Sequence, residues 1–393
     1  MLKFRFVFML LLVFSFSLFS LTFEEAKKIA MDKNRNLEIS ELEVKKAEIA
    51  MRESWASFYP TVSLQSSYTR LLSVPQFEMP MADGSTQPVS LGFPDNYKNS
   101  LQVNFPVFTF GKRFVAKEIG EKSKDVQVLQ HEADKNNLIK DLVTVFYGVV
   151  VAEEGVTIAE DALGRAEDHL RTSKYALNMM LGFPLDTVVD VEGNTETEID
   201  TFDLDSLTGF ALTIRPEIKS MRKLNEMAKL GKSLQYLMFL PDIAFVGSFS
   251  YDKPVGFDNS WDNDMTATIA VSLPIFQGFS RTNAISKNSI TVEQSLIREK
   301  IVSEGIKMEI KSLLLDYRLN KQKLNLAEEQ LKRAREAYEM AEKQYQAGYI
   351  SALEYKDIEL GYRSAEFGYL NAQYNLIVSK EQIKVATVMD KEE

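Results

Sequence analysis

The stretch Tyr345-Gln346-Ala347-Gly348-Tyr349-Ile350-Ser351 interrupts an otherwise continuous helical pattern near the C-terminus. On both sides of it, apolar residues recur in alternating steps of three and four, the 3.5-residue period of a coiled-coil seam. The seam holds Leu324, Ala327, Leu331, Ala334, Tyr338, Ala341 and Tyr345 before the break, and Ile358, Tyr362, Ala365, Tyr369, Ala372 and Leu376 after it. Gly348 supplies a helix C-cap and Ser351 the next N-cap. The run Gly278–Met389 is therefore predicted to be an antiparallel helical hairpin, with an ascending arm near 279–347 about 100 Å long at ~1.5 Å per residue.

The same order of elements occurs twice along the chain. Residues 202–241 align with residues 21–60 without a gap, and the apolar pattern carries the match. Matched positions include Phe23/Leu204, Ala30/Ala211, Leu37/Ile218, Ala47/Ala228, Trp55/Tyr236, Phe58/Phe239 and Pro60/Pro241. Two strand patterns and a long helical pattern follow each copy, which predicts an internal duplication of helix, strand, strand and helix. The predicted divisions are a signal peptide at 1–20, a first repeat at 21–181, an acidic linker at 182–202, a second repeat at 203–389 and a tail at 390–393.

The N-terminal residues have the pattern of an export signal. The basic start Met1–Arg5 precedes a mostly apolar run from Phe6 to Phe19 and the small residue Ser20, as in a secretory signal peptide. The run is short for a membrane helix, which needs ~20 apolar residues. An uncleaved anchor is the alternative.

Composition excludes several classes of function. The chain has no cysteine, which excludes disulfides, thiol chemistry and a lipid-modified N-terminal cysteine. A formal net charge of −10 argues against nucleic acid as a partner. No nucleophile motif, phosphate-binding loop or metal-ligand spacing occurs, and the two histidines, His131 and His169, each stand alone on a predicted helix. An enzyme is therefore not expected, and neither is a cofactor.

Four short stretches alternate apolar with small polar side chains, the period-two pattern of β-strands. They lie near 61–69, 101–105, 243–251 and 265–273. Residues 71–98, with four prolines and two glycines, are predicted to be a loop. No charge lies inside a predicted strand, which suits lipid on one face and water on the other. A half-buried sheet in a soluble protein is the alternative.

Four strands cannot close a membrane barrel, which needs about eight, and lipid does not tolerate open sheet edges. A membrane location therefore requires several copies: a dimer has eight strands, a trimer twelve and a tetramer sixteen. Aromatic residues at predicted strand ends, Tyr59, Phe105 and Tyr251, are candidates for an interfacial belt. Packing in a core explains them as well.

Four motifs, in this order, resemble those of TolC-type outer-membrane efflux proteins over essentially all of the mature chain. Leu21-Thr22-Phe23-Glu24-Glu25-Ala26 resembles the family's opening. Arg215-Pro216-Glu217-Ile218 resembles its Asn-Pro-Glu-Leu segment, whose first-repeat counterpart, Asn34-Arg35-Asn36-Leu37, is degenerate. Leu273-Pro274-Ile275-Phe276-Gln277-Gly278 and its twin Phe105-Pro106-Val107-Phe108-Thr109-Phe110-Gly111 resemble the strand-to-helix junction. Residues 345–351 resemble the hairpin tip.

The resemblance implies a mainly α-helical chain whose long coiled-coil hairpins form a periplasmic tunnel and whose four strands contribute to a trimeric twelve-stranded transmembrane β-barrel. It implies a homotrimer in outer-membrane lipid that exports small molecules or proteins, by efflux or type I secretion, with an inner-membrane transporter and a periplasmic adaptor. The implied adaptor-docking tip consists of Gly348, Tyr349, Ile350 and Ser351. Glu354 and Asp357 are candidates for a charged ring at the periplasmic entrance. A solvated helix face is the alternative for these two carboxylates.

The first repeat departs from the family's pattern. The run Ala176–Asp186 resembles the segment that closes the first return arm, but it comes too early: Gly182 follows Gly111 by 71 residues, close to the 70 residues that separate the tip glycine Gly348 from Gly278. Either the first hairpin is shortened, with a turn near Gly155 or Gly164, or Gly182 is itself a tip and the return is an extended linker. A shortened hairpin puts docking to a standard adaptor in doubt.

Two other classes of function compete with an export channel. One is a structural spacer that bridges two envelope layers and moves no solute. The other is a soluble coiled-coil scaffold with a small β-subdomain. The small polar side chains on the predicted inner faces of the strands favour the channel, because a spacer is expected to fill its interior with bulky residues.

Overall fold

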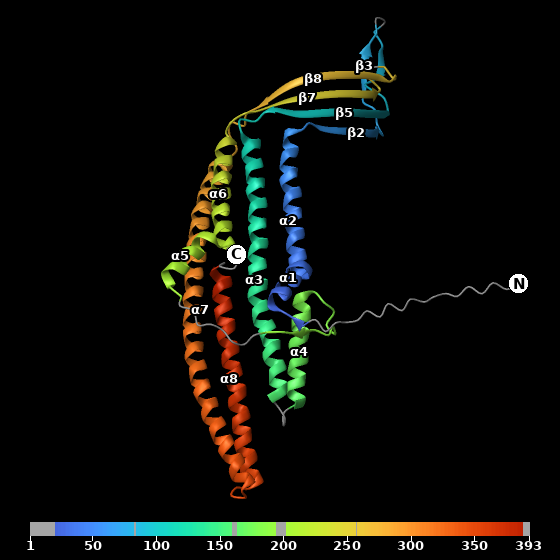
Figure 1. Cartoon of the computed structure of the whole chain (residues 1–393). Helices are drawn as coiled ribbons and strands as arrows, with labels where there is room; N and C mark the ends of the chain where they lie inside the picture. The colour runs from blue at the N-terminus through green and yellow to red at the C-terminus, as the bar shows by residue number, and fades with distance from the viewer. Residues whose placement is uncertain (1–19, 82–83, 159–162, 194–201, 257, 388–393) are drawn as a thin grey trace, which may run out of the picture. The chain divides into compact units, whose positions relative to one another are not determined.

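The computed structural model describes residues 20–81, 84–158, 163–193, 202–256 and 258–387 (Figure 1). The predicted signal peptide, apart from Ser20, and the predicted tail lie outside these residues. The chain forms two compact units: one from Met1–Glu43, Leu129–Lys219 and Lys300–Glu393, the other from Val44–Val128 and Ser220–Glu299. Each sequence repeat contributes helices to both units, so the repeats and the units are different divisions of the chain. The predicted repeat boundaries stay a prediction.

The first repeat contains α1 (Phe23–Lys33), α2 (Arg35–Ser54), β2 (Thr61–Arg70), β5 (Asp95–Phe108), α3 (Lys112–Ile158) and α4 (Leu163–Leu181). The second contains α5 (Leu204–Ile214), α6 (Pro216–Leu237), β7 (Asp242–Lys253), β8 (Asp262–Ser272), α7 (Ser280–Gln346) and α8 (Ala352–Thr387). A short 3-10 helix, η1 (Trp55–Phe58), follows α2. Two-residue strands β1 (Ser20–Leu21) and β6 (Asp190–Val191) pair in parallel. The order predicted from the duplication is thus present twice.

Each repeat begins with two helices separated by a sharp break, α1 and α2 in the first repeat and α5 and α6 in the second. In the first repeat the break is Asn34, whose side-chain oxygen accepts hydrogen bonds from the amides of Asn36 (2.9 Å) and Leu37 (3.3 Å). A side chain that caps the next helix in this way leaves its own backbone extended, so the chain turns. In the second repeat Arg215 occupies the break and Pro216 starts α6, as proline prefers the first helical position.

The paired repeat positions form two equivalent cores in the first unit. Ala26 and Ala30 of α1 pack with Phe146 of α3 and with α4, while Leu207 and Ala211 of α5 pack with α7 and α8. Ala26 and Leu207 are repeat equivalents, as are Ala30 and Ala211, and all four are buried. The apolar positions that match between the repeats therefore lie on the faces of the short helices α1 and α5 that pack against the longer helices of the same repeat.

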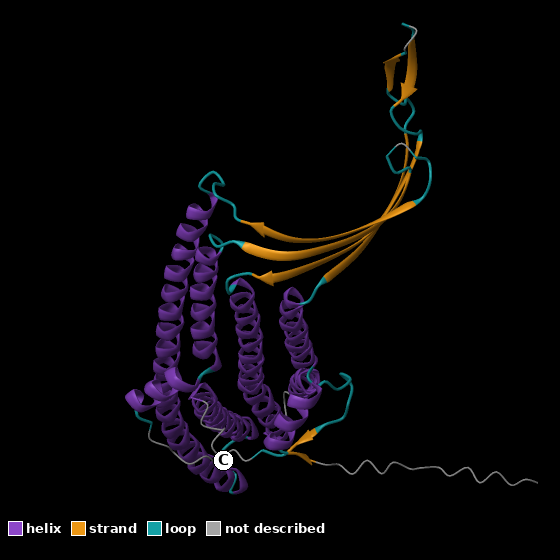
Figure 2. Cartoon of the chain, turned by 90° about the horizontal axis from the view of Figure 1, so that it is seen from above, coloured by secondary structure: helices purple, strands orange, loops and turns teal. Residues whose placement is uncertain are grey.

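The sheet of the second unit is antiparallel, in the order β2-β5-β7-β8 (Figure 1), and its strands are drawn in orange in Figure 2. The central pair, β5 and β7, comes from different repeats, so the duplication builds one sheet. The strand predicted to end at Pro106 continues to Phe108. The pairing of β5 with β7 shifts in register between Pro106 and Phe108. Such an irregularity accommodates Pro106, which has no amide proton to donate to the neighbouring strand.

The segment 71–98, predicted to be a loop, instead contains a hairpin of β3 (Gln76–Pro80) and β4 (Thr86–Ser90), and it includes the start of β5. Four prolines favoured a loop. Both strands of an isolated two-stranded ribbon are edge strands, however, where proline is tolerated because one row of amides needs no partner.

The first hairpin is shortened. Its outgoing helix α3 ends at Ile158 and its return helix α4, of 19 residues, begins at Leu163, whereas α8, the return helix of the second hairpin, has 36 residues. The alternative in which Gly182 is a tip is wrong, because Gly182 follows the end of α4. The second hairpin agrees closely with its prediction: α7 has 67 residues and ends at Gln346.

The backbone conformation and the close neighbours of Gly182 both require glycine at this position. Its φ is +72°, in the left-handed region that favours glycine. A Cβ atom there would collide with the backbone carbonyl of Lys33 at the end of α1. The residue therefore lets the return helix of the first hairpin approach the helix break at Asn34, whose side-chain amide donates to the carbonyl of Met180 (2.9 Å).

We expect Gly182→Ala to destabilise the protein more than Gly348→Ala. Both glycines follow a helix with positive φ (+72° and +76°), but a Cβ at Gly348 meets nothing within 4 Å. Gly348→Ala should cost about 1 kcal/mol for the backbone alone, and Gly182→Ala about 1–3 kcal/mol more for overpacking. Thermal unfolding of the two variants in detergent measures the difference. Equal unfolding temperatures for the two variants would contradict the close approach of Gly182 to the carbonyl of Lys33.

Candidate functional site

The two faces of the four-stranded sheet have opposite chemistry. Cross-strand partners share a face, so the pairing defines rows that run across all four strands. One central row of the apolar face is Leu64, Leu101, Phe249 and Met265, and the neighbouring row of the polar face is Ser63, Gln102, Ser248 and Thr266. The apolar side chains are exposed in the single chain, with 74% of Leu64 and 81% of Met265 accessible. Such a face suits lipid, and the polar face suits water.

An aromatic cluster lies on the apolar face at one end of the sheet. The Trp261 ring stacks on Tyr251, with centroids 4.9 Å apart, and lies 5.6 Å from Tyr97, which in turn lies 4.9 Å from Tyr68. Of the predicted belt residues, Tyr251 belongs to this cluster, Phe105 pairs with Phe245 nearer the other end, and Tyr59 lies outside the sheet. Trp261 was missed because it precedes β8 and belongs to no alternating pattern.

Charged residues do occur inside the strands, contrary to the prediction. The strands of the structure are longer than predicted, and they include Lys98, Asp252 and Asp264. All three lie on the polar face: Lys98 pairs with Asp252, and Asp264 pairs with Ser250. The division holds through the middle of the sheet but not at the end that carries the aromatic cluster, where Asn99, Asn263, Lys253 and the ion pair of Arg70 with Asp95 lie on the same side as the apolar row.

The tip of the second hairpin is built from two complementary caps. At the end of α7, the amide of Tyr349 donates to the carbonyl of Gln344 (2.8 Å) and that of Gly348 to Tyr345 (3.0 Å), with Gly348 at φ +76°. This is a Schellman motif, which satisfies the last carbonyls of a helix. At the start of α8, Ser351 is the N-cap predicted from the sequence.

Ser351 and Glu354 form a capping box. The Glu354 amide donates to the Ser351 hydroxyl (3.2 Å), and the Glu354 carboxylate accepts from the amide and the hydroxyl of Ser351 (2.8 Å each). These hydrogen bonds, that from the backbone amide first, hold the pKa of Glu354 below its ordinary value. Asp357 is exposed and makes no hydrogen bond or ion pair within the described chain. Of the two carboxylates predicted for the entrance, Glu354 is therefore held in the capping box, and only Asp357 makes no hydrogen bond within the described chain.

Four tyrosines join the two arms of the hairpin above the tip. Tyr355 stacks on Tyr345 (centroids 5.0 Å) and Tyr338 stacks on Tyr362 (5.2 Å). The hydroxyls of Tyr338 and Tyr355 lie 2.9 Å apart. This hydrogen bond is the main reason why the pKa of Tyr355 rises to about 12. The seam residues Tyr338, Tyr345 and Tyr362, predicted from their spacing, thus meet across the hairpin.

A network of charges in the first unit surrounds the second helix break. The Arg215 guanidinium donates to Glu217 and to Glu309 of α7 (2.7 Å each), and Lys140 of α3 donates to the other oxygen of Glu309 (2.6 Å). Only 11% of the Arg215 side chain is exposed. Burial by itself raises the pKa of Glu309, but the hydrogen bonds from Lys140 and Arg215 outweigh it, so the pKa of Glu309 lies below its ordinary value.

In the part of the chain that the structure describes, no three His, Asp or Glu side chains are grouped so that they could hold a metal ion. The helices among these residues also include none with the length and hydropathy needed to cross a bilayer.

Comparison with known proteins agrees with this geometry. Residues 210–387 match the family model of outer membrane efflux proteins. The whole fold is similar to solved channel structures, with 93% of this chain covered in each case. The family match covers a little under half of the chain, so it shows that the second repeat is similar to the outer membrane efflux proteins. None of the curated protein sequences matches it.

Three solved structures illustrate the fold shared with this family. The MtrE outer membrane channel of Neisseria gonorrhoeae, in its open state, superposes with a TM-score of 0.74 at 14% identity and is covered over 88% of its length. CusC gives 0.73 at 15% identity and 91% coverage. The CmeC outer membrane channel of Campylobacter jejuni gives 0.73 at 14% identity and 85% coverage.

Members of the outer membrane efflux protein family are outer-membrane channels with helical tunnels in the periplasm. The predictions of family, fold class, export channel and outer-membrane location are confirmed at this level. The family's members are channels and not enzymes. The predicted tip and entrance residues are untested by these comparisons.

We expect removal of the Arg215 side chain to destabilise this protein strongly. Arg215→Met leaves Glu309 half-buried with one cation fewer, which should cost about 3 kcal/mol. Arg333→Met, which breaks the exposed pair of Arg333 with Glu329 (side chains 80% and 68% exposed), should cost less than about 1 kcal/mol. Denaturant unfolding compares the two variants, and equal losses would contradict a buried network.

The start of α8 should loosen in acid. Because the folded-state pKa of Glu354 is lowered, its contribution is complete above the ordinary value of 4.5 and is lost as the pH falls through the lower folded value. Hydrogen exchange of amides 352–356, corrected for the intrinsic rate, measures this loss. We expect Glu354→Gln to abolish the pH dependence and Asp357→Asn to retain it. An unchanged profile in Glu354→Gln would contradict the role of the capping box.

Proposed function

We propose that three copies of this chain form a twelve-stranded outer-membrane barrel with a helical periplasmic tunnel, which exports solutes. The observation that carries the proposal is the sheet. It exposes an apolar and a polar face, and its edge strands, β2 and β8, each have one unpaired row of backbone groups. Lipid requires those groups to be paired, so β8 of one copy pairs with β2 of the next.

The size of the side chains on the polar face favours a conducting channel over a closed spacer. Apart from Val246, the central rows carry serine, threonine, asparagine and glutamine, including Thr61, Asn104 and Thr268. Twelve strands surround a wider interior than the eight that side chains just fill. Small polar residues on that interior leave room for water.

In this proposal the channel supplies a passive path and its partners supply the energy. A periplasmic adaptor and an inner-membrane transporter are the partners that the similarity to this family supports. The tip Gly348–Ser351 is the predicted adaptor contact. Its exposed Tyr349, 83% accessible, is the side chain there that a partner would cover. Asp357 is the remaining carboxylate for the entrance. With Glu354 committed to its capping box, each chain contributes one charge to such a ring.

An arginine on either face of the sheet tests the proposal. Met265 and Thr266 are neighbours in β8 on opposite faces. Met265→Arg should cost about 2–4 kcal/mol in lipid and deplete the trimer from the outer membrane. Thr266→Arg should assemble normally and shift ion selectivity toward anions. The measurements are cross-linked mass in detergent, about 130 kDa for three chains of 44.7 kDa less their signal peptides, and conductance in planar bilayers.

The outcomes separate the candidate functions. A trimer that carries no current supports a structural spacer. A soluble monomer, or an assembly that tolerates Met265→Arg and rejects Thr266→Arg, overturns the barrel. Current through wild-type protein with the expected selectivity shift supports the channel.

A further inference from the structure

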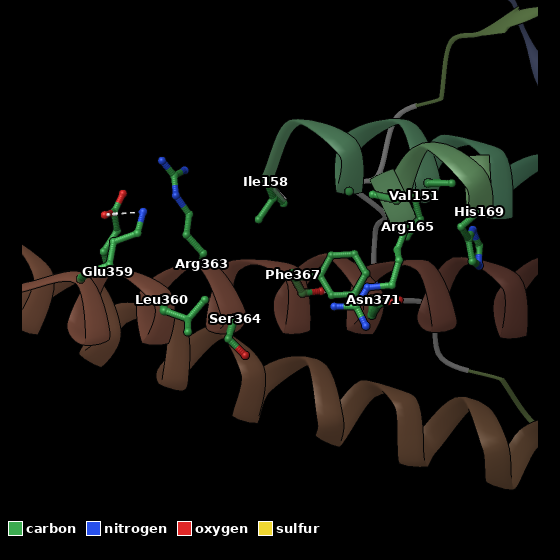
Figure 3. A pocket seen from close by; sticks show the side chains of 14 residues that line it. Val151, Ile158, Arg165, His169, Glu359, Leu360, Arg363, Ser364, Phe367 and Asn371 are labelled. Carbon is green, nitrogen blue, oxygen red and sulfur yellow. Dashed lines mark hydrogen bonds and ion pairs between the residues drawn. The ribbon is translucent and has the colours of Figure 1, made fainter. Parts of the chain in front are cut away.

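A cavity of about 440 Å³ lies where the end of the first hairpin meets the side of α8 (Figure 3). On one side of it the two hairpins touch, since a Cβ on Gly155 of α3 would lie 2.9 Å from the Phe367 ring of α8. Helix α3 ends at Ile158 and α4 begins at Leu163, whereas α8 continues past both toward Ala352. The cavity is therefore enclosed by the ends of two helices and the side of a third.

Most of the lining of this cavity is apolar. Val151 and Ile158 come from α3, and Leu360 and Phe367 come from α8. Cavities of about 300–1,000 Å³ with mainly apolar walls and a few polar groups are typical of sites for small organic molecules. The walls suit the hydrocarbon part of such a molecule. They disfavour an inorganic ion, which would lose its hydration without enough polar groups to replace it.

The Lys, Arg, Asp and Glu side chains of the described chain that line the cavity are three cations and one carboxylate: Arg165, Lys356, Arg363 and Glu359. Lys356 and Glu359 pair at 3.5 Å, and Arg363 lies 3.5 Å from the carboxylate of Glu366. Arg165 makes no hydrogen bond or ion pair with the residues that the structure describes. The lining therefore complements an anion, and Arg165 is the cation best placed to receive its charge.

Arg165 lies beside the apolar walls. It extends from α4 toward Phe367 and Asn371 of α8 (Figure 3), and His169, one turn further along α4, lines the same cavity. A guanidinium holds a carboxylate through two parallel N–H donors, a geometry that a lysine cannot provide. A ligand whose carboxylate binds Arg165 therefore places the adjoining hydrocarbon against Phe367.

We propose that this cavity binds an amphipathic organic carboxylate, with its charge on Arg165 and its apolar ring or chain on Ile158, Leu360 and Phe367. The bound molecule contacts both the end of the first hairpin and α8, so it stabilises the packing of one hairpin on the other. The site is independent of the proposed export function, because all of its lining residues belong to the first unit.

Other classes of ligand fit the cavity less well. A cation would meet three cationic side chains and one carboxylate. A nucleotide or another polyphosphate needs several cations, whereas Lys356 and Arg363 already pair with carboxylates of α8. A neutral apolar molecule would fill the same walls but leave the charge of Arg165 unmatched, so a neutral probe is the control for the proposal.

Photolabelling with two probes of the same shape tests the site. 4-Benzoylbenzoate carries a carboxylate on two linked aromatic rings, and 4-benzoylbenzamide lacks the charge. On irradiation both insert into nearby C–H bonds, and mass spectrometry locates the labelled peptides. In assembled wild-type protein in lipid nanodiscs, the carboxylate should label peptides that contain Ile158, Leu360 or Phe367 saturably. It should do so about fivefold more than the amide, as expected for one partly solvated ion pair.

Three variants assign the effect to this cavity. Arg165→Gln should lower the ratio of carboxylate to amide labelling to about one, because it removes only the ion pair. Arg171→Gln is the matched control and should keep the wild-type ratio, since Arg171 lies on the same helix in an exposed pair with Asp168. Leu360→Trp narrows the cavity and should lower labelling by both probes. The side chain of Leu360 is 55% exposed, so the fold accepts this change.

Each alternative outcome overturns a stated part of the proposal. Equal labelling of wild-type protein by the two probes, or an unchanged ratio in Arg165→Gln, would overturn the anion site. Saturable labelling of other peptides only would overturn the cavity as its location. Labelling of dissociated chains but not of the assembled protein would assign the cavity to an interface between copies. Absence of conductance with labelling intact would instead count against the proposed function alone.

Discussion

The two open edges of the four-stranded sheet are the constraint on which the rest of this molecule depends. In the edge strands β2 and β8, every second residue has a backbone amide and carbonyl without a strand partner in its own chain. Each unpaired group costs several kcal/mol in hydrocarbon, so a single chain cannot be stable there. Closure by identical copies removes both edges at once and imposes cyclic symmetry. The helices that continue from the strands then follow the same symmetry, which suits a tunnel wall.

The two junctions at which a strand leads into a long helix have similar backbones and different charged anchors. After β5 and after β8, the chain turns into its long helix through an aromatic residue and a glycine with positive φ: Phe110 (50°) and Gly111 (87°), then Gly278 (56°) and Phe279 (62°). The charged anchors beside them differ. Lys112 donates to Asp242 (2.8 Å) and to the carbonyl of Leu240 (2.9 Å), which ties the first junction to the start of β7. Arg281 donates to the carbonyl of Pro274 within its own junction. The first junction thus links the two repeats.

Periodic features were predictable from the sequence, and contacts between distant residues were not. The seam predicted the helices α7 and α8, and its break at Gly348 and Ser351 predicted where α7 ends and α8 begins. The period-two pattern located all four strands of the sheet. By contrast, the capping role of Asn34 was not predicted, since it depends on where the chain bends. Glu309 gave no signal, because its partners Arg215 and Lys140 lie 94 and 169 residues away in sequence. The short first hairpin left two alternatives open, because a glycine marks a helix end and a hairpin tip equally well.

The unequal lengths of the two hairpins explain why the tyrosines are placed where they are. Where both hairpins run side by side, α8 packs on α7 through one face and on α3 through another, and residues such as Leu376 are fully buried. Below Ile158 the α7–α8 pair has no first hairpin beside it, and two helices alone bury little apolar area. Tyr338, Tyr345, Tyr355 and Tyr362 all lie in that segment. Their rings supply large, rigid contacts with few rotamers to lose, and the hydrogen bond between Tyr338 and Tyr355 satisfies their hydroxyls within the pair. The two arms of this segment are thus held together by contacts within the pair itself.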